Sequence, residues 1–402
     1  MTTTAPIAIE APDIDFLSGA FWGGDPHPAL TWIRENDPLY FDGTVWGVST
    51  HGLLRDISRR PHPFSNAQGI RPDSGPLPMM IDLDDPEHFR RRKLVSEGFM
   101  PKRVRETEGA IREACDDIID DVAERGECDF VKDIASWLPM IMIGDALGVP
   151  HEMRGTLLEW SDDMLRGLVG SQGEAMEKAG AAYAGFREYI VPALEERRLN
   201  PRDDLLSLLV HAEIDGDRLD DEALIHESLL ILIGGDETTR HVISGGLYQL
   251  LANPSEKKKV LDDPTAIPRA VEEMLRWVSP IRNMTRTVLE DTELAGKPLK
   301  EGDKLLLLYP SANRDAAVFE DPFRFDIDRF PNDHVAFGFG THFCLGNKLA
   351  RLELRCMFEH LFRRLPDIAL AEDREPANRA ANFVSGYESM PVLFTPAARV
   401  GA

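Results

Sequence analysis

The ten residues 337–346 (FGFGTHFCLG) combine one cysteine with three glycines and lead into an apparent helix. Cys344 stands just before that helix, where the positive end of the helix dipole and nearby backbone N–H groups favour a thiolate. A single thiolate in an apolar pocket is a suitable ligand for haem iron. Gly340 and Gly346 would let the backbone pass close to a flat macrocycle, and Phe337 would shield the sulfur from water. The alternative is that Cys344 is a small buried hydrophobe, as many free cysteines are.

A second unusual stretch lies within a long apolar pattern. Residues 229–239 read LLILIGGDETT, so two glycines, two acids and two threonines stand in the middle of a predicted helix. Each glycine costs about 1 kcal/mol relative to alanine in a helix, and such local conflicts are typical of functional sites. The acid and alcohol of Glu237 and Thr238 could together pass protons as a general-acid relay. The alternative is that the glycines allow close helix packing while the polar residues face water.

Two further pairs have helical spacing. His88 and Arg92 share a helix face in a segment that opens at Asp85-Pro86, together with basic residues at 90, 91 and 93. Taken alone, this cluster suits either a solvated basic face or a site for an acidic group. Glu273 and Arg276 are three residues apart and can form an ion pair, although most such pairs lie at the surface and contribute little.

The long helix that carries the glycine pair is predicted over residues 220–252. Asp220-Asp221-Glu222 suits a helix start, and Asn253-Pro254 ends the pattern. Thirty-odd residues at this rise span roughly 45 Å, which is enough to cross the whole molecule. Residues 1–20 are expected to form a loose arm, and residues 103–200 are expected to be mostly helical.

The predicted strands are few and short. Residues 38–50 predict a hairpin with Asp42-Gly43 at its turn, residues 305–309 a buried strand, and residues 382–394 a second hairpin. Between them, the proline-broken loop 61–86 contains apolar residues without a strand or helix period. A loop of this length is usually functional or disordered.

Composition restricts the class of protein. The net charge of −24 argues against nucleic acid or an anionic membrane surface as a partner. The four cysteines, at 115, 128, 344 and 356, lack CxxC spacing, which argues against a zinc site or disulfide framework and favours a reducing, cytoplasmic location. No signal peptide is expected. The longest apolar run, 229–233, is far shorter than the 20 or so residues of a transmembrane helix.

Taken together and in this order, four motifs resemble those of the cytochrome P450 monooxygenases. They are the HxxxR pair at His88 and Arg92, the [AG]-G-x-[DE]-T run at 234–238, the ExxR pair at 273–276, and the cysteine loop. The resemblance implies a mainly α fold with a small β region, a single domain over 1–402, and a long central helix over a haem b. It further implies a B–C loop at 61–86, a substrate lid region at 150–200, an oxygen-binding helix at 220–252 and a haem-cysteine loop at 337–346.

The resemblance also assigns roles to single residues. Cys344 would be the axial ligand of the haem iron, Thr238 would contact bound O₂, and Glu237 would deliver protons. Glu273 and Arg276 would form a structural pair on the sulfur side. The haem itself would be contacted by His88, Arg92, Gly234, Arg286, Phe337, His342, Cys344 and Gly346. Of these, His88, Arg92, Arg286 and His342 would hold the propionates.

A closer similarity is to the actinobacterial sterol side-chain hydroxylases, carried by the runs 70–73, 77–82, 234–241 and 382–390. These enzymes oxidise the terminal methyl of cholesterol or cholest-4-en-3-one. The same activity is expected of this chain, with oxidation on to the aldehyde and acid as an extension. The expected substrate pocket is apolar and would be lined by Ile70, Leu77, Met79, Met80, Ile233, Met284, Phe383 and Val384.

Electrons must come from a partner, because the sequence contains no flavin or iron–sulfur motif. The resemblance implies a ferredoxin with its reductase, and Lys93, Lys348, Arg351 and Arg355 could form its basic dock. A monomer is expected. Two alternatives stay open: a P450 hydroxylase of fatty acids or terpenoids, and a haem protein that binds a ligand or senses a gas without turnover.

Overall fold

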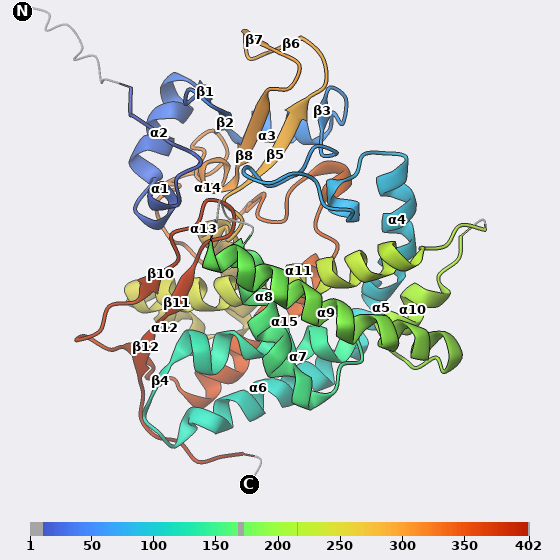
Figure 1. The fold of residues 1–402 in the computed structure, drawn as a ribbon. Coiled ribbons are helices and arrows are strands. Elements are labelled where there is room, and N and C mark those ends of the chain that lie inside the picture. Colours follow the sequence, from blue (N-terminus) through green and yellow to red (C-terminus); the bar gives the residue numbers. More distant parts are fainter. Residues whose placement is uncertain (1–10, 168–172, 215, 401–402) are drawn as a thin grey trace, which may run out of the picture.

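The computed structural model describes residues 11–167, 173–214 and 216–400, so residues 1–10 of the predicted arm and 168–172 of the predicted lid lie outside it. Helices form most of the molecule, and a small sheet lies at one end beside the first helices (Figure 1). The α-helices are α1 (Gly19–Gly23), α2 (His27–Asn36), α3 (His51–Ser58), α4 (Glu87–Ser96), α5 (Pro101–Glu106), α6 (Glu108–Ala123), α7 (Trp137–Ala146), α8 (Arg154–Gly167), α9 (Glu174–Leu199), α10 (Leu205–His211), α11 (Asp221–Ala252), α12 (Pro254–Asp262), α13 (Ile267–Val278), α14 (Tyr309–Ala312) and α15 (Asn347–Arg364).

The largest sheet has the strand order β1-β2-β8-β5-β3, with β2 and β8 parallel and the other pairs antiparallel. The predicted hairpin at 38–50 is confirmed, because Leu39 pairs with Val48 and Gly43 has a φ of +99° at the turn. The predicted strand at 305–309 is also confirmed, although it begins and ends one residue earlier than predicted. Its leucines are fully buried. The strands are β1 (Leu39–Phe41), β2 (Trp46–Val48), β3 (Phe64–Ser65), β5 (Asn283–Val288) and β8 (Lys304–Leu308).

The predicted hairpin at 382–394 is wrong. Tyr387–Ser389 pairs with β10, and Pro391–Leu393 pairs with two other strands, because the single residue Met390 leaves no room for a turn between them. The smaller sheets consist of β4 (Glu127–Asp129), β12 (Pro391–Leu393) and β9 (Ala369–Leu370); β10 (Ala377–Asn378) and β11 (Tyr387–Ser389); and β6 (Thr292–Leu294) and β7 (Lys297–Leu299).

Helix α11 confirms the predicted long helix. The side chain of Asp220 accepts a hydrogen bond from the backbone N–H of Ala223 and caps the first turn, and the helix ends at Ala252 before Asn253-Pro254. Its 32 residues extend over about 48 Å. It contacts α7, α8, α9, α13 and α15 along its length, so the core of the helical layer forms around it (Figure 1).

The predicted lid region is helical, and the predicted loop 61–86 contains short regular elements. Helices α8 and α9 pack on each other and on α11 within the expected lid region. The loop 61–86 contains more regular structure than expected, namely β3 and the single-turn helix η1 (Met80–Asp82). Side-chain hydrogen bonds, which a hydrophobic period does not reveal, hold η1 in place.

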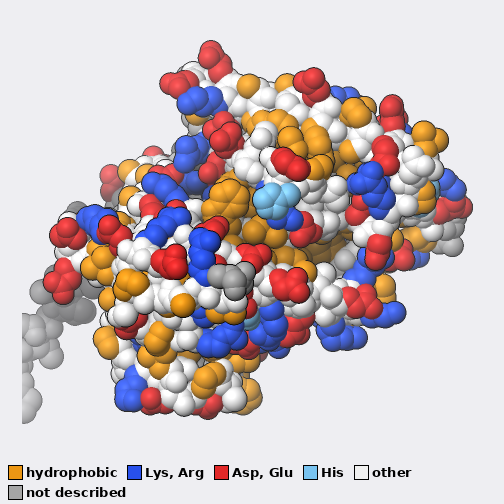
Figure 2. All heavy atoms as spheres, turned by 90° about the horizontal axis from the view of Figure 1, so that it is seen from below, with side chains coloured by type: hydrophobic (Ala, Val, Ile, Leu, Met, Phe, Trp, Pro, Cys, Tyr) orange, Lys and Arg blue, Asp and Glu red, His pale blue; other side chains and the backbone are white. Residues whose placement is uncertain are grey.

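The surface carries charges of both signs. In the view from below, acidic and basic side chains are intermingled around hydrophobic side chains in a hollowed area (Figure 2). Within the residues that the structure describes, no helix combines the length and apolar character needed to span a bilayer.

Candidate active site

The cysteine loop is fixed by backbone hydrogen bonds. The Cys344 N–H donates to the Phe337 carbonyl at 2.9 Å, and the Asn347 side chain donates to the Cys344 carbonyl at 2.7 Å. Burial raises the pKa of the Cys344 thiol, and the N–H groups of Gly346 and Asn347 and the charge of Arg92 lower it. The backbone N–H groups act in the expected direction, and in the protein alone burial outweighs them. A bound cation would reverse that balance, since metal coordination deprotonates a thiol.

The same loop is locked against α3. Gly340 has a φ of +77°, and a Cβ there would lie 2.2 Å from the Ser58 carbonyl oxygen, so this turn requires glycine. Phe339 lies under the guanidinium groups of Arg55 and Arg59, at 4.3 and 4.8 Å from its ring centre. The loop is thus held rigidly whether or not a group occupies the cavity beside it.

A large cavity separates α11 from the cysteine loop and α15. It encloses about 1450 Å³ of space not filled by atoms, part of it in its open mouth. Gly234 borders it from α11 and Gly346 from the cysteine side, and a Cβ on either would meet no atom within 4 Å. The two glycines leave both walls free for a flat group between them. Cys344, Phe337 and Leu345 line one side, and Ile231, Thr238 and Val242 line the other.

The two glycines of the central helix have different roles. Both border the cavity, as predicted, but a Cβ on Gly235 would lie 2.9 Å from the Ile143 side chain of α7. Gly235 therefore allows close packing of α7 on α11 rather than opening space for a ligand alone. The Thr238 hydroxyl donates to the Gly234 carbonyl at 3.1 Å and lies in the cavity wall. Its oxygen is accessible to a ligand that enters the cavity.

Four basic residues predicted to hold propionates line one edge of the cavity. The rings of His88 and His342 stack at 3.9 Å, and Arg92 donates to the Phe343 carbonyl. Burial and the neighbouring cations lower the pKa of His342 to about 2, so it is neutral. Arg286 is 4% exposed and donates to the Thr285 carbonyl; Asp84 acts on it only through its charge, and no carboxylate of the described residues forms an ion pair with it. A buried arginine without a paired acid fits an anionic ligand, and so these residues fit a haem with its propionates.

The Glu273–Arg276 pair lies beneath the cysteine side and is completely buried. Its two hydrogen bonds measure 2.8 and 2.7 Å, and Arg276 also donates to three backbone carbonyls, of Asn313, Pro322 and Arg324. Arg329 adds a second cation to Glu273 at 3.2 Å. Because every polar atom finds a partner, the pair can fix the chain segments that lead into the cysteine loop.

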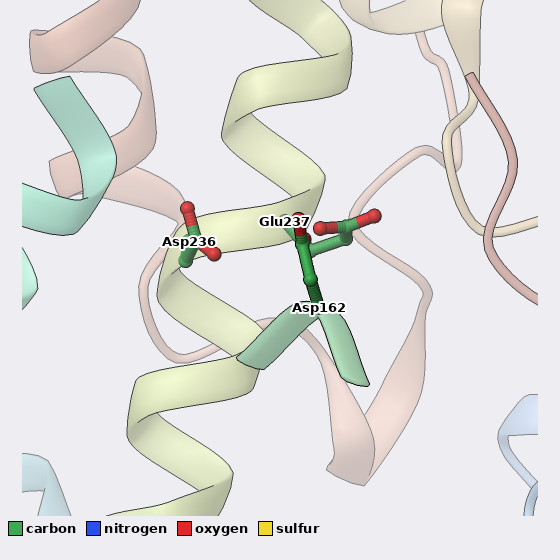
Figure 3. A group of neighbouring side chains, drawn as sticks. All are labelled: Asp162, Asp236 and Glu237. Carbon is green, nitrogen blue, oxygen red and sulfur yellow. The ribbon is translucent and has the colours of Figure 1, made fainter. Parts of the chain in front are cut away.

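Glu237 does not line the cavity. It is 1% exposed and pairs with Arg240, with Arg379 from the segment before β11, and with His241 at 3.0 Å. Arg240 continues to Asp162 of α8 at 2.6 Å, and Arg379 to Glu388 at 3.2 Å. Figure 3 shows Asp162 reaching from α8 toward the turn of α11 that bears Glu237. Asp162, Arg240 and Arg379 were not predicted from the sequence, because only Arg240, three residues after Glu237, gives a local signal.

Asp236 adds a third carboxylate to this region. One oxygen from each of Asp162, Asp236 and Glu237 lies within 4.8 Å of the others. Burial raises the pKa of Asp236 to about 6, and neither of its carboxylate oxygens has a hydrogen-bond partner among the described residues. Since Arg240 and Arg379 already supply cations here, we interpret the group as an ion-pair network.

The predicted substrate residues divide into two layers. Met80 and Met284 line the cavity. Ile70, Phe383 and Val384 form a cluster behind Met284, and Leu77, Met79 and Ile233 pack in the apolar core beside the cavity. The lining instead includes residues not predicted, because the exposed face of each element is set by packing: Ile81, Phe99, Leu230, Ile231, Pro280 and Ile281.

Comparison with known proteins agrees with this geometry. The Cytochrome P450 family profile matches residues 56–383. Steroid C26-monooxygenase of Mycobacterium tuberculosis is 51% identical over 98% of this chain and 100% of that protein, and steroid C26-monooxygenase of Mycolicibacterium smegmatis is 50% identical over 97% and 98%. The structure of a Mycobacterium marinum cytochrome P450 in complex with pseudoionone superposes with a TM-score of 0.88, at 32% identity, over 97% of this chain and all of that one.

Proposed function

The chain belongs to the cytochrome P450 family, and from this premise we propose that it hydroxylates the terminal methyl of a sterol side chain, cholesterol or cholest-4-en-3-one, with further oxidation to the acid as an extension. The observation that carries the substrate is full-length similarity to two steroid C26-monooxygenases. The apolar cavity supports it, since a long apolar ligand is bound mainly by burial, at about 25 cal/mol per Å² before association costs.

The residues of the site have separate roles in the proposed reaction. A haem b bound to Cys344 supplies the iron chemistry that activates O₂ and inserts one oxygen atom into a C–H bond. Arg286, Arg92, His88 and His342 would hold its propionates, and Phe337 and Leu345 exclude water from the sulfur. The Thr238 hydroxyl lies in the cavity wall with its proton donated to the Gly234 carbonyl, and it would turn to donate that proton to a bound ligand. Glu237, one residue earlier and buried away from the cavity, would replace the proton through water.

Electron supply is part of the proposal. A ferredoxin with its reductase would dock on the cysteine side. There Arg351 already pairs with Glu272 at 2.7 Å and Arg355 with Glu108 at 2.8 Å, whereas Lys93 and Lys348 of the predicted dock are both exposed. If charge steers this docking, raising the salt concentration lowers the ferredoxin-dependent rate; a rate independent of salt would contradict the dock. A cytoplasmic location and a monomeric state stay predictions.

The test is an optical titration of the purified ferric haem protein with cholest-4-en-3-one. We expect a saturable shift from low to high spin, and hydroxylation of the terminal methyl on reconstitution with ferredoxin. Haem bands without a shift would contradict the sterol substrate, and products from fatty acids or terpenoids would then identify the class. Substitution Cys344→Ala should abolish the thiolate-type spectrum; an unchanged spectrum would contradict the haem site itself.

A further inference from the structure

Helix α11 carries a second buried acid that the reaction does not use. Glu227 is completely buried, seven residues before Gly234 and therefore about 10 Å along the helix from it. Spacings of four, seven and eleven residues place Ile231, Gly234 and Thr238 on the same face, which is the face that borders the cavity. A buried carboxylate on this face requires a partner, because an unpaired one is strongly disfavoured.

The partner of Glu227 is the backbone of the loop that forms the cavity wall. The Met80 N–H donates to Glu227 Oε1 at 2.7 Å. Met80 is the first residue of η1, and the Met79 side chain provides no cap, so this N–H has no acceptor within its own helix. Glu227 therefore caps η1 from a different element. Met80 itself lines the cavity.

Arg91 of α4 completes this contact. Its Nη1 donates to the Pro78 carbonyl at 3.0 Å and lies 3.4 Å from Glu227 Oε1, so one guanidinium joins the loop, α4 and α11. The far side of the loop is held by Asp82, whose carboxylate accepts from the Leu77 N–H at 2.8 Å and pairs with Arg71. Residues 77–81 thus lie between the buried carboxylates of Glu227 and Asp82, and among the described residues Glu227 is the hydrogen-bond acceptor that α11 offers to this segment.

We propose that Glu227 and Arg91 are positioning residues that hold residues 78–80 as a fixed wall of the substrate cavity and thereby set its affinity for a large apolar substrate. This inference rests on the proposed function for the identity of the substrate and on geometry alone for the position of the wall. Burial raises the pKa of Glu227 to about 7 because it outweighs the Met80 N–H and the single cation, Arg91, and Oε2 of Glu227 has no hydrogen-bond partner among the described residues. A glutamate retained here at such a cost is consistent with a positioning role.

The first measurement needs no substrate. Hydrogen exchange of the haem-loaded protein, followed by mass spectrometry, reports the protection of a peptide that covers residues 77–82. Glu227→Leu removes the acceptor, and we expect exchange in this peptide to accelerate at least tenfold. Glu227→Gln keeps an acceptor oxygen and should retain most of the protection. Unchanged exchange in Glu227→Leu would overturn the proposal.

The second measurement is affinity, compared between a large ligand and a small one. Optical titration with cholest-4-en-3-one should show Kd raised about tenfold in Glu227→Leu and about threefold in Arg91→Met, while Kd for imidazole, too small to reach Met80, stays the same. Glu222→Gln is the matched control, because Glu222 lies on the same helix in an exposed pair with Arg187. Accelerated exchange with an unchanged sterol Kd would overturn the positioning role, as would a loss of both affinities together.

The two proposals can fail separately. Wild-type protein with haem bands but no response to cholest-4-en-3-one would contradict the proposed substrate. The rate of hydrogen exchange in residues 77–82 of the Glu227 and Arg91 variants would still test whether these two residues hold the wall. Should Glu227→Leu fold poorly, Arg91→Met leaves the Met80 cap intact and tests the same wall, since it removes the donor to Pro78.

Discussion

Glu227 and Glu237 lie ten residues apart on one helix and are equally hidden from solvent, yet their surroundings are opposite. Glu237 contacts two arginines and a histidine and belongs to a network that reaches α8 and β11. Glu227 has one backbone N–H and one arginine at 3.4 Å. Burial alone therefore does not define an acid's role. Glu237 is an ion-pair partner of two arginines, whereas Glu227 is mainly the acceptor of a backbone N–H.

The largest expected difference comes from removal of the better-paired acid. Glu237→Leu leaves Arg240 and Arg379 with only their outer partners, and we expect the free energy of unfolding to fall by about 3 kcal/mol. Urea denaturation measures this loss. Glu237→Gln, which keeps the shape, should retain more stability while substrate hydroxylation slows and uncoupled peroxide rises. A Leu variant as stable as the wild type would show that the network contributes no net stability.

A pH series sharpens the comparison at Glu227. Its pKa is raised from the ordinary 4.5 to about 7, so the folded state binds more protons than the unfolded state between these values, and stability falls as pH rises. Arg91 opposes this shift and Asp82 adds to it. From pH 5 to pH 8 the wild type should lose about 2 kcal/mol relative to Glu227→Gln, measured by urea unfolding at each pH. Parallel pH profiles for the two proteins would contradict the raised pKa.

The smallest expected effect is that of removing one cation from the better-paired acid. Arg379→Met leaves Glu237 with Arg240, so we expect a loss of about 1 kcal/mol in unfolding free energy. The melting temperature of this variant, compared with that of the exposed-pair variant Arg187→Met, measures the contribution of the buried contact. A loss as large as that of Glu237→Leu would mean that the stability contributed by Glu237 depends on Arg379 alone.

Local signals in the sequence predicted part of this molecule well. Asp220 as a cap and Asn253-Pro254 as a stop place α11 to within a residue, and the spacing around Cys344 identifies the loop beside the cavity. These predictions succeed because a cap, a proline or a glycine acts on its immediate neighbours.

Contacts between distant segments were not predicted. Arg379 reaches Glu237 across 142 positions, and Met80 reaches Glu227 across 147, so no pattern within one element reveals either partner. For the same reason, several residues predicted for the substrate pocket pack behind or beside the cavity wall. Ile233 and Gly234 are neighbours in sequence, but only Gly234 borders the cavity, because helix packing decides which face is exposed. Glu227 had one usable signal, its position on the face that also carries Gly234 and Thr238.

The buried carboxylate of Asp82 bears on the thermodynamics of ligand binding. It accepts bonds from Leu77 and Ile70 and pairs with Arg71, so residues 77–82 are ordered by the chain's own contacts. The entropic cost of ordering residues 77–82 is therefore part of the free energy of folding, and it does not reduce the free energy of ligand binding. A ligand that reaches Met80 meets a surface that is already fixed. On this side of the cavity, selectivity is decided when the chain folds rather than when the ligand binds.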